Sequence, residues 1–490
     1  MISPHILFLR KQVYHQFVSL STSKQQTHKM EEIDMKEKQT DSLEIFKSAP
    51  IGQAVLKNTI PAMVAMMMVL IYNLADTFFI GQTKDAFMIA AVSLVTPVFL
   101  LFMAVGTVFG IGGTSVISRA MGEGRKEYSK KVCSFCMWSC VIAGVVMVIV
   151  IFAFMDPILK MLGASADTME YARQYLSIVT IAGPFVLISN CYANIIRTEG
   201  KAGMAMIGQL GGNLLNVILD PILILGFGWN VVGAAIATAV SNLVSAAYYI
   251  GYFKFGKSML SISPKDFSVK DHILKGVLAI GVPAALGDIL MSVSSIVLNS
   301  QMAKYGDMAV AGVGVAMKVT MITGMICIGF GQGIQPLLGY CVGAKNWKRY
   351  KESLRFSVIF GFGLSTFMTI ICYVFDRQIV GAFLSEPEAF QYGVEFSRIL
   401  LTTSFLFGIF YVLSNALQAM GAAASALIIN MSRQGLIYIP VIFLLQSIIG
   451  MDGLLWAQPV ADILSVILVV ILYRVTLKNK IHTQEAKSVC

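Results

Sequence analysis

Two aspartates stand out because each lies inside a long apolar run. Asp76 is near the end of a run that starts at about residue 55, and Asp220 is near the end of another. Tyr72 is one helical turn before Asp76, and Asn213 and Asn216 share a helical face with Asp220. Carboxylates with neutral oxygen ligands suit a small hard cation, and two neighbouring acids in a low-dielectric setting also suit proton carriage.

Further polar side chains lie in neighbouring apolar runs of the first half of the chain. Pro221 directly follows Asp220, so it removes a helical hydrogen bond and frees the carbonyl of Val217. Asparagine and threonine oxygens would add to this set, and we expect Asp76 to face the interior and bind a cation. The remaining polar residues are Thr238, Ser241, Asn242 and Ser245 in one run, and Asn190 and Asn194 in another.

The composition shows which solvent surrounds these runs. The chain has 490 residues, of which 56% are hydrophobic and only 13% charged, and its mean hydropathy is +0.74. Soluble domains carry about 25% charged residues, so we expect an all-helical integral membrane protein. Twelve apolar runs are long enough to span a bilayer. They lie at about 55–79, 90–113, 132–154, 175–196, 203–226, 231–253, 276–299, 309–333, 355–375, 397–417, 424–446 and 452–473.

The distribution of positive charge predicts the orientation. With the N-terminus in the cytoplasm, 29 of the 37 Lys and Arg residues fall on the inside and 6 on the outside. This asymmetry favours a multi-pass plasma-membrane protein with both termini cytoplasmic. The net charge of +10 then reflects topology, and we expect no nucleic-acid partner. Lys318 and Arg433 lie inside spans, as do Asp288 and Asp462, and each has either a structural pairing or an interface position as its ordinary explanation.

The two halves of the chain repeat one plan. Asn194 matches Asn415, and the segment GIGGTSVISRAMGEG from Gly110 matches GQGIQPLLGYCVGAK from Gly331, all at nearly the same offset. Each half has six spans, so the halves share one orientation, and we expect two six-helix lobes related by a pseudo-two-fold axis along the membrane normal. Two lobes around a central cavity suit alternating access, which favours a transporter over a channel.

These features predict five segments of the chain. They are a cytoplasmic tail (1–53), an N-lobe (54–253), a cytoplasmic linker (254–275), a C-lobe (276–475) and a second cytoplasmic tail (476–490). Met30 begins a segment that looks like an ordinary start, so residues 1–29 are either an upstream extension or a tail, and the sequence leaves both open.

Catalysis is not indicated. The five histidines are in the tails or the linker, and Cys133 and Cys136 form a lone C-x-x-C without a second pair. We therefore expect no transition-metal site, no cofactor and no enzymatic activity. A membrane enzyme remains the less favoured alternative, and a major-facilitator transporter is disfavoured because the loop SRAMGEGRKEY lacks the Asp-Arg pair of that family.

At three motifs the chain resembles a known family. YNLADTFFIG, GGTSVISRAMGEG and NLLNVILDPILILGFGWNVVGAAIATAVSN resemble the multidrug and toxic compound extrusion (MATE) family, nearest its MepA-type bacterial branch. The resemblance covers about residues 45–475. It implies a secondary active multidrug efflux transporter that exports lipophilic organic cations by antiport with Na⁺ or H⁺.

The resemblance also implies a set of coupling-ion ligands. In family members with a first-lobe site, the ligands are carried on the first, fourth, fifth and sixth helices, and the NorM-type branch uses acids of the seventh and tenth helices instead. The tenth span here has no acid, so a second-lobe ion site is not expected. The ligands fall on Tyr72, Asp76, Asn194, Asn216, Asp220 and Thr238, with Asn190, Asn213 and Asp288 as additional candidates.

The substrate class follows from less specific features. The chain has 28 Met, 30 Phe and 17 Tyr residues, and polarizable and aromatic side chains suit lipophilic cations. We expect small-molecule organic cations and the lipid bilayer as partners, and a monomer. A flippase for lipid-linked oligosaccharides is the closest alternative; it would need a strongly cationic cavity, for which Lys318 and Arg433 are the only hints.

Overall fold

The structure is a computed structural model that describes residues 43–82, 86–256 and 258–489. Eleven helices in this part of the chain are long and apolar enough to cross a membrane, and a bent pair makes twelve. The predicted twelve-span, all-helical class is confirmed, with the tenth span broken by a 40° bend. Of the predicted tail at 1–53, residues 1–42 lie outside the described residues.

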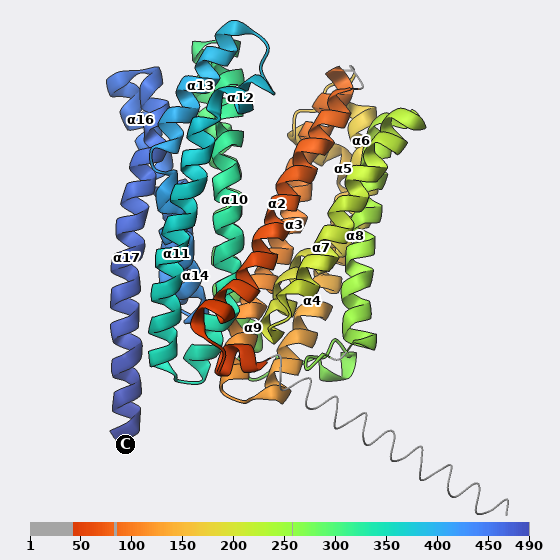
Figure 1. Cartoon of the computed structure of the whole chain (residues 1–490). Coiled ribbons are helices and arrows are strands. Elements are labelled where there is room, and N and C mark those ends of the chain that lie inside the picture. The colour runs from red at the N-terminus through yellow and green to blue at the C-terminus, as the bar shows by residue number, and fades with distance from the viewer. Residues whose placement is uncertain (1–42, 83–85, 257, 490) are drawn as a thin grey trace, which may run out of the picture.

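The first six spans form the N-lobe, the right-hand bundle in Figure 1. The chain is helical because apolar residues fill these runs and because a backbone in hydrocarbon must satisfy its own hydrogen bonds. The elements are α2 (Ile51–Gly81), α3 (Ala86–Gly122), α4 (Lys126–Ala153), the short α5 (Met155–Met161), α6 (Met169–Ile195) with the 3-10 turn Ile196–Glu199, α7 (Ala202–Asp220) with the π-helical turn Pro221–Gly226, and α8 (Asn230–Phe255).

The last six spans form the C-lobe, on the left in Figure 1. A linker with the 3-10 turn Pro264–Asp266 leads into it. Its elements are α9 (Ile273–Met302) with the turn Ala303–Tyr305, α10 (Asp307–Gly343), α11 (Trp347–Val374), α12 (Asp376–Gly381), α13 (Pro387–Leu401), the turn Ser404–Leu406, α14 (Phe407–Ala419), α15 (Ala423–Met431), the π-helical turn Ser432–Leu436, α16 (Tyr438–Ile449) and α17 (Met451–Val489).

The two lobes contact each other reciprocally. A Cβ added to Gly122 would lie 2.1 Å from the carbonyl oxygen of Tyr340, and one added to Gly343 would lie 2.0 Å from that of Arg119. Gly122 and Gly343 occupy matching positions of the sequence repeat, and Arg119 and Tyr340 match at the same offset. Each contact is therefore the two-fold image of the other, which is the relation that the repeat predicts.

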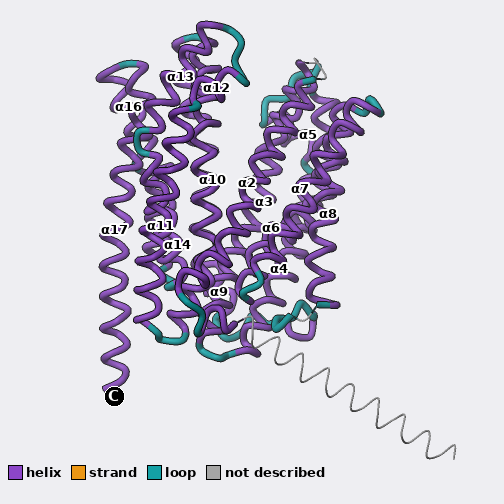
Figure 2. Tube along the Cα trace, viewed as in Figure 1, coloured by secondary structure: helices purple, strands orange, loops and turns teal. Residues whose placement is uncertain are grey.

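The bundles meet at one end and diverge toward the other, as Figures 1 and 2 show. At the closed end α2 packs against α10 and α9 packs against α3. Gly281 lies against the backbone of Val108, and Gly329 lies against that of Ala62 and Met63. Because these glycines lack side chains, the helices approach each other at backbone distance.

Each segment that precedes a lobe packs on the other lobe. Arg349 of the C-lobe donates to the carbonyl oxygens of Phe46 (2.6 Å) and Ala49 (2.7 Å), just before α2. In the N-lobe, Trp138 Nε1 donates to the carbonyl of Ile262 (3.2 Å) in the linker before α9. The closed end is thus cross-braced by the two connecting segments.

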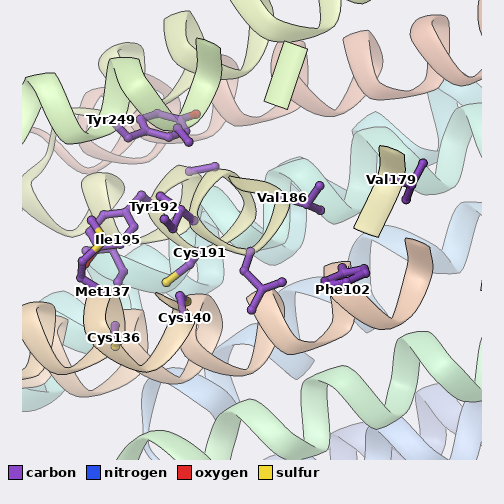
Figure 3. Close-up of a cluster of buried hydrophobic side chains, with 14 of the residues drawn as sticks. Phe102, Cys136, Met137, Cys140, Val179, Val186, Cys191, Tyr192, Ile195 and Tyr249 are labelled. Atoms are coloured by element: carbon purple, nitrogen blue, oxygen red, sulfur yellow. The ribbon is translucent and has the colours of Figure 1, made fainter. Parts of the chain in front are cut away.

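The N-lobe core is centred on α6. Figure 3 shows its Val186, Cys191 and Tyr192 packed against residues of α3, α4 and α8, among them Cys136 and Cys140. These cysteines are buried and free. Within the described residues there is no group of three or more His, Cys, Asp or Glu side chains that could hold a metal ion.

Candidate functional site

The structure brings Asp76 and Asp220 together although they are far apart in the chain. α2 carries Asp76 and packs against α7, which carries Asp220 at its last residue before the π-helical turn. Their charges are close enough to interact with each other and with the phenol of Tyr72. Tyr175 of α6 also lies within reach of both acids and of Tyr72. The two acids and the two tyrosines are therefore carried by α2, α6 and α7.

Asn216 and Thr238 connect this acid pair to α8. With its amide nitrogen facing the carboxylate, Asn216 donates to Oδ2 of Asp220 at 3.2 Å and accepts from the backbone N–H of Thr238 at 3.3 Å. Asp220 is fully buried, and Asn216 and Thr238 are 2% and 7% exposed. The spacing Asn-x-x-x-Asp thus places both side chains on one face of α7, toward the interior of the lobe.

The acids are not fully satisfied by the protein. Oδ1 of Asp76 and Oδ1 of Asp220 are buried and accept no hydrogen bond. Among the described residues no Lys or Arg forms an ion pair with either carboxylate. A buried carboxylate oxygen without a donor is unfavourable by several kcal/mol unless a cation or a proton reaches it. The oxygen donor set fits a hard cation or a proton.

A pocket lies beside the acids, and all its lining residues belong to the N-lobe. Tyr72, Asn216 and Thr238 belong both to its wall and to the surroundings of the acid pair. The pocket wall combines apolar and amide groups, which suits an organic solute with a few polar contacts. Its other lining residues are Val69, Phe99, Met103, Val186, Ser189, Asn190, Gln209, Gly212, Asn213, Ser241, Asn242 and Ser245.

The additional candidates lie at different places. Asn213 and Asn190 line the pocket, and Asn190 donates to the Met103 carbonyl at 2.7 Å. Asn194 lies one turn further along α6, donates to the Asn190 carbonyl at 3.0 Å and accepts from Arg197 at 3.2 Å. Of the two asparagines on α6, the structure places Asn190 at the pocket and Asn194 in a network that leads to the C-lobe.

Asp288 does not join the acid pair. It is an exposed residue of α9, in the other lobe, and its hydrogen-bond partner is Thr107 of α3. Thr107 in turn accepts from Asn190 at 3.1 Å. Among the described residues, Asp288 therefore connects to the pocket wall through Thr107 and Asn190.

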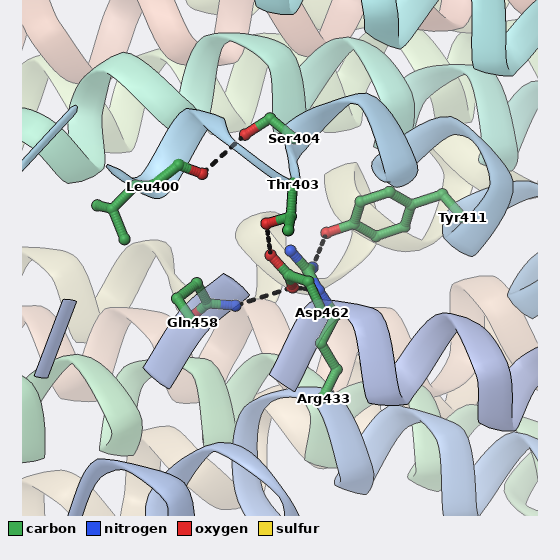
Figure 4. Close-up of polar contacts among 7 residues, drawn as sticks. All are labelled: Leu400, Thr403, Ser404, Tyr411, Arg433, Gln458 and Asp462. Atoms are coloured by element: carbon green, nitrogen blue, oxygen red, sulfur yellow. Dashed lines mark hydrogen bonds and ion pairs between the residues drawn. The ribbon is translucent and has the colours of Figure 1, made fainter. Parts of the chain in front are cut away.

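A second polar network is buried in the C-lobe (Figure 4). Asp462 of α17 accepts from Arg433 Nε at 2.8 Å, from Thr403 Oγ1 at 3.1 Å and from Gln458 Nε2 at 2.9 Å. Arg433, in the π-helical turn between α15 and α16, also donates to the hydroxyl of Tyr411 at 2.8 Å. Asp462 thus has a cation and two neutral donors from its own lobe.

The fold and these two buried networks define a two-lobed multi-pass membrane transporter, and the family can be stated. The MatE family model matches residues 61–222 and, a second time, residues 283–444, so it recognises each lobe separately. The chain belongs to the MATE family, as the sequence motifs predict.

Individual relatives agree with this placement. The chain is 33% identical over 425 residues to the multidrug export protein MepA of Staphylococcus aureus strain MSSA476, covering 86% of this chain and 93% of that protein. It is 31% identical over 448 residues to MepA of Staphylococcus haemolyticus strain JCSC1435, covering 91% of this chain and 98% of that protein. The expected nearness to the MepA-type branch is confirmed.

Solved structures show the same fold. An outward-facing multidrug resistance MATE family transporter of the MOP superfamily superposes with a TM-score of 0.85 at 25% identity, covering 90% of this chain and 98% of that one. A MOP superfamily transporter from Pyrococcus furiosus superposes with a TM-score of 0.84 at 24% identity, with the same coverage.

Sequence reasoning missed several residues that the structure places at these sites. Tyr175 lies in a polar stretch, next to Gln174, so no contrast with its neighbours marks it. Gln209 lies four residues before Asn213, so the polar stripe of Asn213, Asn216 and Asp220 could have been extended to it. Arg433 and Asp462 lie on separate elements, so their pairing has no local signature either. The pair could have been predicted from the fact that Arg433 and Asp462 are isolated charges in apolar runs, because a buried charge requires a partner.

Proposed function

We propose that this chain is a secondary active multidrug efflux transporter that exports lipophilic organic cations in exchange for Na⁺ or H⁺. The observation that supports it best is the pair of carboxylates, each with a buried oxygen lacking a donor, beside a pocket inside the N-lobe. The family and the MepA relatives support the export of drugs. Transport needs no bond-making step, so no catalytic residue and no cofactor enter the proposal.

The exchange follows from the residues that the two sites share. Asn216 donates to Asp220, Thr238 donates to Asn216, and Tyr72 interacts electrostatically with both acids; all three residues also form the pocket wall. A cation or proton that neutralises Asp76 and Asp220 would change the charge and the side-chain positions at this wall. Organic cation and coupling ion would then favour different states of the N-lobe, which is the differential binding that coupling requires.

The energy of the coupling ion is sufficient. One elementary charge moving through 100 mV releases about 2.3 kcal/mol. A tenfold gradient of substrate corresponds to about 1.4 kcal/mol. One ion per cycle can therefore drive a concentrative export step.

Alternating access would use the two lobes as units. The closed end lies next to the loops after Gly122 and Gly343, which carry several Lys and Arg residues. By the charge rule this end is cytoplasmic, with both chain termini on the same side, so the bundles diverge toward the outside. In this arrangement a single chain holds the whole site, and we propose a monomer in the plasma membrane.

The flippase alternative receives less support. Its two sequence hints were Lys318 and Arg433, which would have to face a cationic cavity. Arg433 is buried and paired with Asp462, and the ammonium of Lys318 lies 5.2 Å from the ring centre of Phe383. Neither residue lines the N-lobe pocket.

Dye efflux from proteoliposomes tests the proposal, with a Na⁺ or an H⁺ gradient imposed one at a time. We expect efflux of a cationic dye with one of the two gradients. Asp76→Asn and Asp220→Asn should each abolish gradient-driven efflux, because neither variant keeps two acids for the ion, while folding and dye binding persist. Asp452→Asn, at an exposed acid of α17, is the matched control and should transport normally. Wild-type rates in either site variant would refute the coupling role.

A further inference from the structure

The guanidinium of Arg433 is enclosed by three aromatic rings. Its central carbon lies 4.5 Å from the ring centre of Phe407, 5.1 Å from that of Phe410 and 5.4 Å from that of Tyr411. The carboxylate of Asp462 completes the enclosure, at 2.8 Å from Nε. Arg433 and Asp462 are 7% and 2% exposed.

This enclosure has the chemistry of an organic-cation site. Aromatic faces attract cations such as guanidinium and quaternary ammonium ions, and more strongly when water is excluded. A carboxylate supplies the counter-charge. Thr403 and Gln458 donate to Asp462 and hold its two oxygens in place, as Figure 4 shows, so the carboxylate is oriented independently of Arg433.

The repeat relates this enclosure to the N-lobe pocket. At the offset that matches Asn194 with Asn415, Gly212 corresponds to Arg433 and Asn190 corresponds to Tyr411. Both N-lobe counterparts, Gly212 and Asn190, line the pocket. The positions of Arg433 and Tyr411 therefore have repeat-related counterparts in the wall of the N-lobe pocket.

The counter-charge has a pocket-lining counterpart as well. α8 and α17 are matched by their glycine contacts, since Gly233 packs on the carbonyl of Leu223 just as Gly453 packs on that of Leu445. Counted from these two glycines, Asp462 corresponds to Asn242, which also lines the pocket. The enclosure is thus the C-lobe equivalent of the N-lobe pocket.

We propose that the C-lobe contains a second organic-cation site, formed by Phe407, Phe410, Tyr411 and Asp462, whose ligand is the side chain of Arg433. A glycine at the related position leaves the N-lobe pocket open, whereas the arginine fills its C-lobe counterpart from within. The ligand class is a monoalkyl guanidinium. The consequence for transport rests on the proposed function: exported cations bind in the N-lobe alone.

Chemical rescue tests this site. Arg433→Ala removes the atoms of ethylguanidinium, so this ion, at millimolar concentration, is the probe. We expect Arg433→Ala in the full-length purified protein to have a lower thermal denaturation midpoint than wild type. Ethylguanidinium should raise the midpoint of the variant saturably. The concentration needed should be at least about tenfold lower than any concentration that affects wild type. Ethylurea, a neutral molecule of similar shape, should have no effect.

The double variant Arg433→Ala/Asp462→Asn is the matched control. It keeps the cavity and the rings but loses the counter-charge, and we expect no response to ethylguanidinium. Equal rescue of the double variant, equal rescue by ethylurea, or a folded Arg433→Ala that does not respond would overturn the proposal. The same titration in an Asp220→Asn background separates the two sites, because loss of the N-lobe acids should leave the rescue unchanged.

A further pair of variants decides the case in which Arg433→Ala is not recovered as folded protein. Arg433→Lys keeps a cation among the rings, whereas Arg433→Met keeps a similar length without charge. We expect the lysine variant to denature at the higher temperature. A methionine variant as stable as the lysine variant would show that the enclosure does not require a cation, and the proposal would fail.

Discussion

At the scale of single residues, the same kind of group has two different environments in this protein. Asp462 accepts from a cation and two neutral donors of its own lobe. Asp76 and Asp220 each keep a buried oxygen without a donor. A fully paired buried charge is structural, whereas an incompletely paired one depends on a ligand or a proton, because leaving it unpaired is costly. This difference, rather than the presence of acids, identifies the N-lobe as the coupling lobe we propose.

Tyr72→Phe should weaken coupling-ion binding without disturbing the fold. The variant keeps the ring that lines the pocket and loses the hydroxyl beside the two acids. Loss of one oxygen ligand worth about 1 kcal/mol corresponds to about a fivefold change in affinity. The ion concentration for half-maximal efflux should rise by about this factor. Tyr248→Phe, whose exposed hydroxyl contacts only Met204 among the described contacts, should leave it unchanged.

Glu199→Gln should detach the linker from the N-lobe. The buried carboxylate of Glu199 accepts from Tyr252 at 2.6 Å, from Ser258 at 2.8 Å and from the backbone N–H of Met259 at 2.5 Å. A carboxamide must turn its NH₂ group toward one of these donors, with an expected loss of about 2 kcal/mol. The denaturation midpoint should fall, and proteolysis within the linker should accelerate.

Glu127→Gln is the control for this substitution. Glu127 is largely exposed and pairs only with Lys130 among the described residues, and surface ion pairs contribute little. Unchanged stability and unchanged proteolysis in Glu199→Gln would contradict the anchoring role of the buried carboxylate.

At the scale of helices, the closed end depends on backbone contact. Gly122 and Gly343 allow α3 and α10 to touch where they cross the pseudo-two-fold axis, since no side chain separates them. α2 with α10, and α9 with α3, extend this contact between the lobes. Opening this end during transport would have to separate these helices. A small change in packing at the glycines should therefore shift the balance between the closed and the open state of this end.

Gly122→Ala or Gly343→Ala should open the closed end. The added methyl group would lie about 2 Å from a carbonyl oxygen of the opposite lobe, and overpacking of this kind costs about 1–3 kcal/mol. We expect the native Cys341, which is 1% exposed, to become reactive toward a membrane-permeant maleimide, as located by peptide mass spectrometry.

Gly314→Ala provides the control within α10. An added Cβ there has no neighbour within 4 Å, so alanine should be tolerated or slightly stabilising. If the two interface variants left Cys341 as protected as this control does, the closed end would not depend on the glycine contacts.

At the scale of the whole molecule, a symmetric frame holds asymmetric contents. The lobes repeat their helices, their reciprocal glycine contacts and their cross-packed connecting segments. Within the part of the chain that the structure describes, the acid pair belongs to the N-lobe and the Arg433 enclosure to the C-lobe. The two similar lobes can move relative to each other as units, and the polar residues in which they differ decide where ligands bind.

The orientation of this frame can be checked by labelling. Lys265 is exposed in the linker at the closed end, so we expect Lys265→Cys to be protected from an impermeant thiol reagent in intact cells and reactive in inverted vesicles. Ala166→Cys, exposed in the loop between α5 and α6, should show the opposite pattern. Labelling of Lys265→Cys from outside would reverse the proposed topology.

The sequence determined the class, the twelve spans, the repeat and the stripes that carry Asp76, Asn216 and Asp220. These are properties of local periodicity, hydrophobicity and spacing, which are readable along the chain. It did not distinguish among the charged residues Asp288, Arg433 and Asp462, because each is a single charge in an apolar run.

Only the tertiary structure separated these charges. It paired Arg433 with Asp462, left Asp288 solvent-exposed beside Thr107 of the other lobe, and placed Asn190 rather than Asn194 at the pocket. Partners from different helices are chosen by how the helices pack, and a helical turn more or less moves a side chain from a pocket to a neighbouring network. Packing therefore decided which polar residues are satisfied within the protein and which are left to bind a ligand.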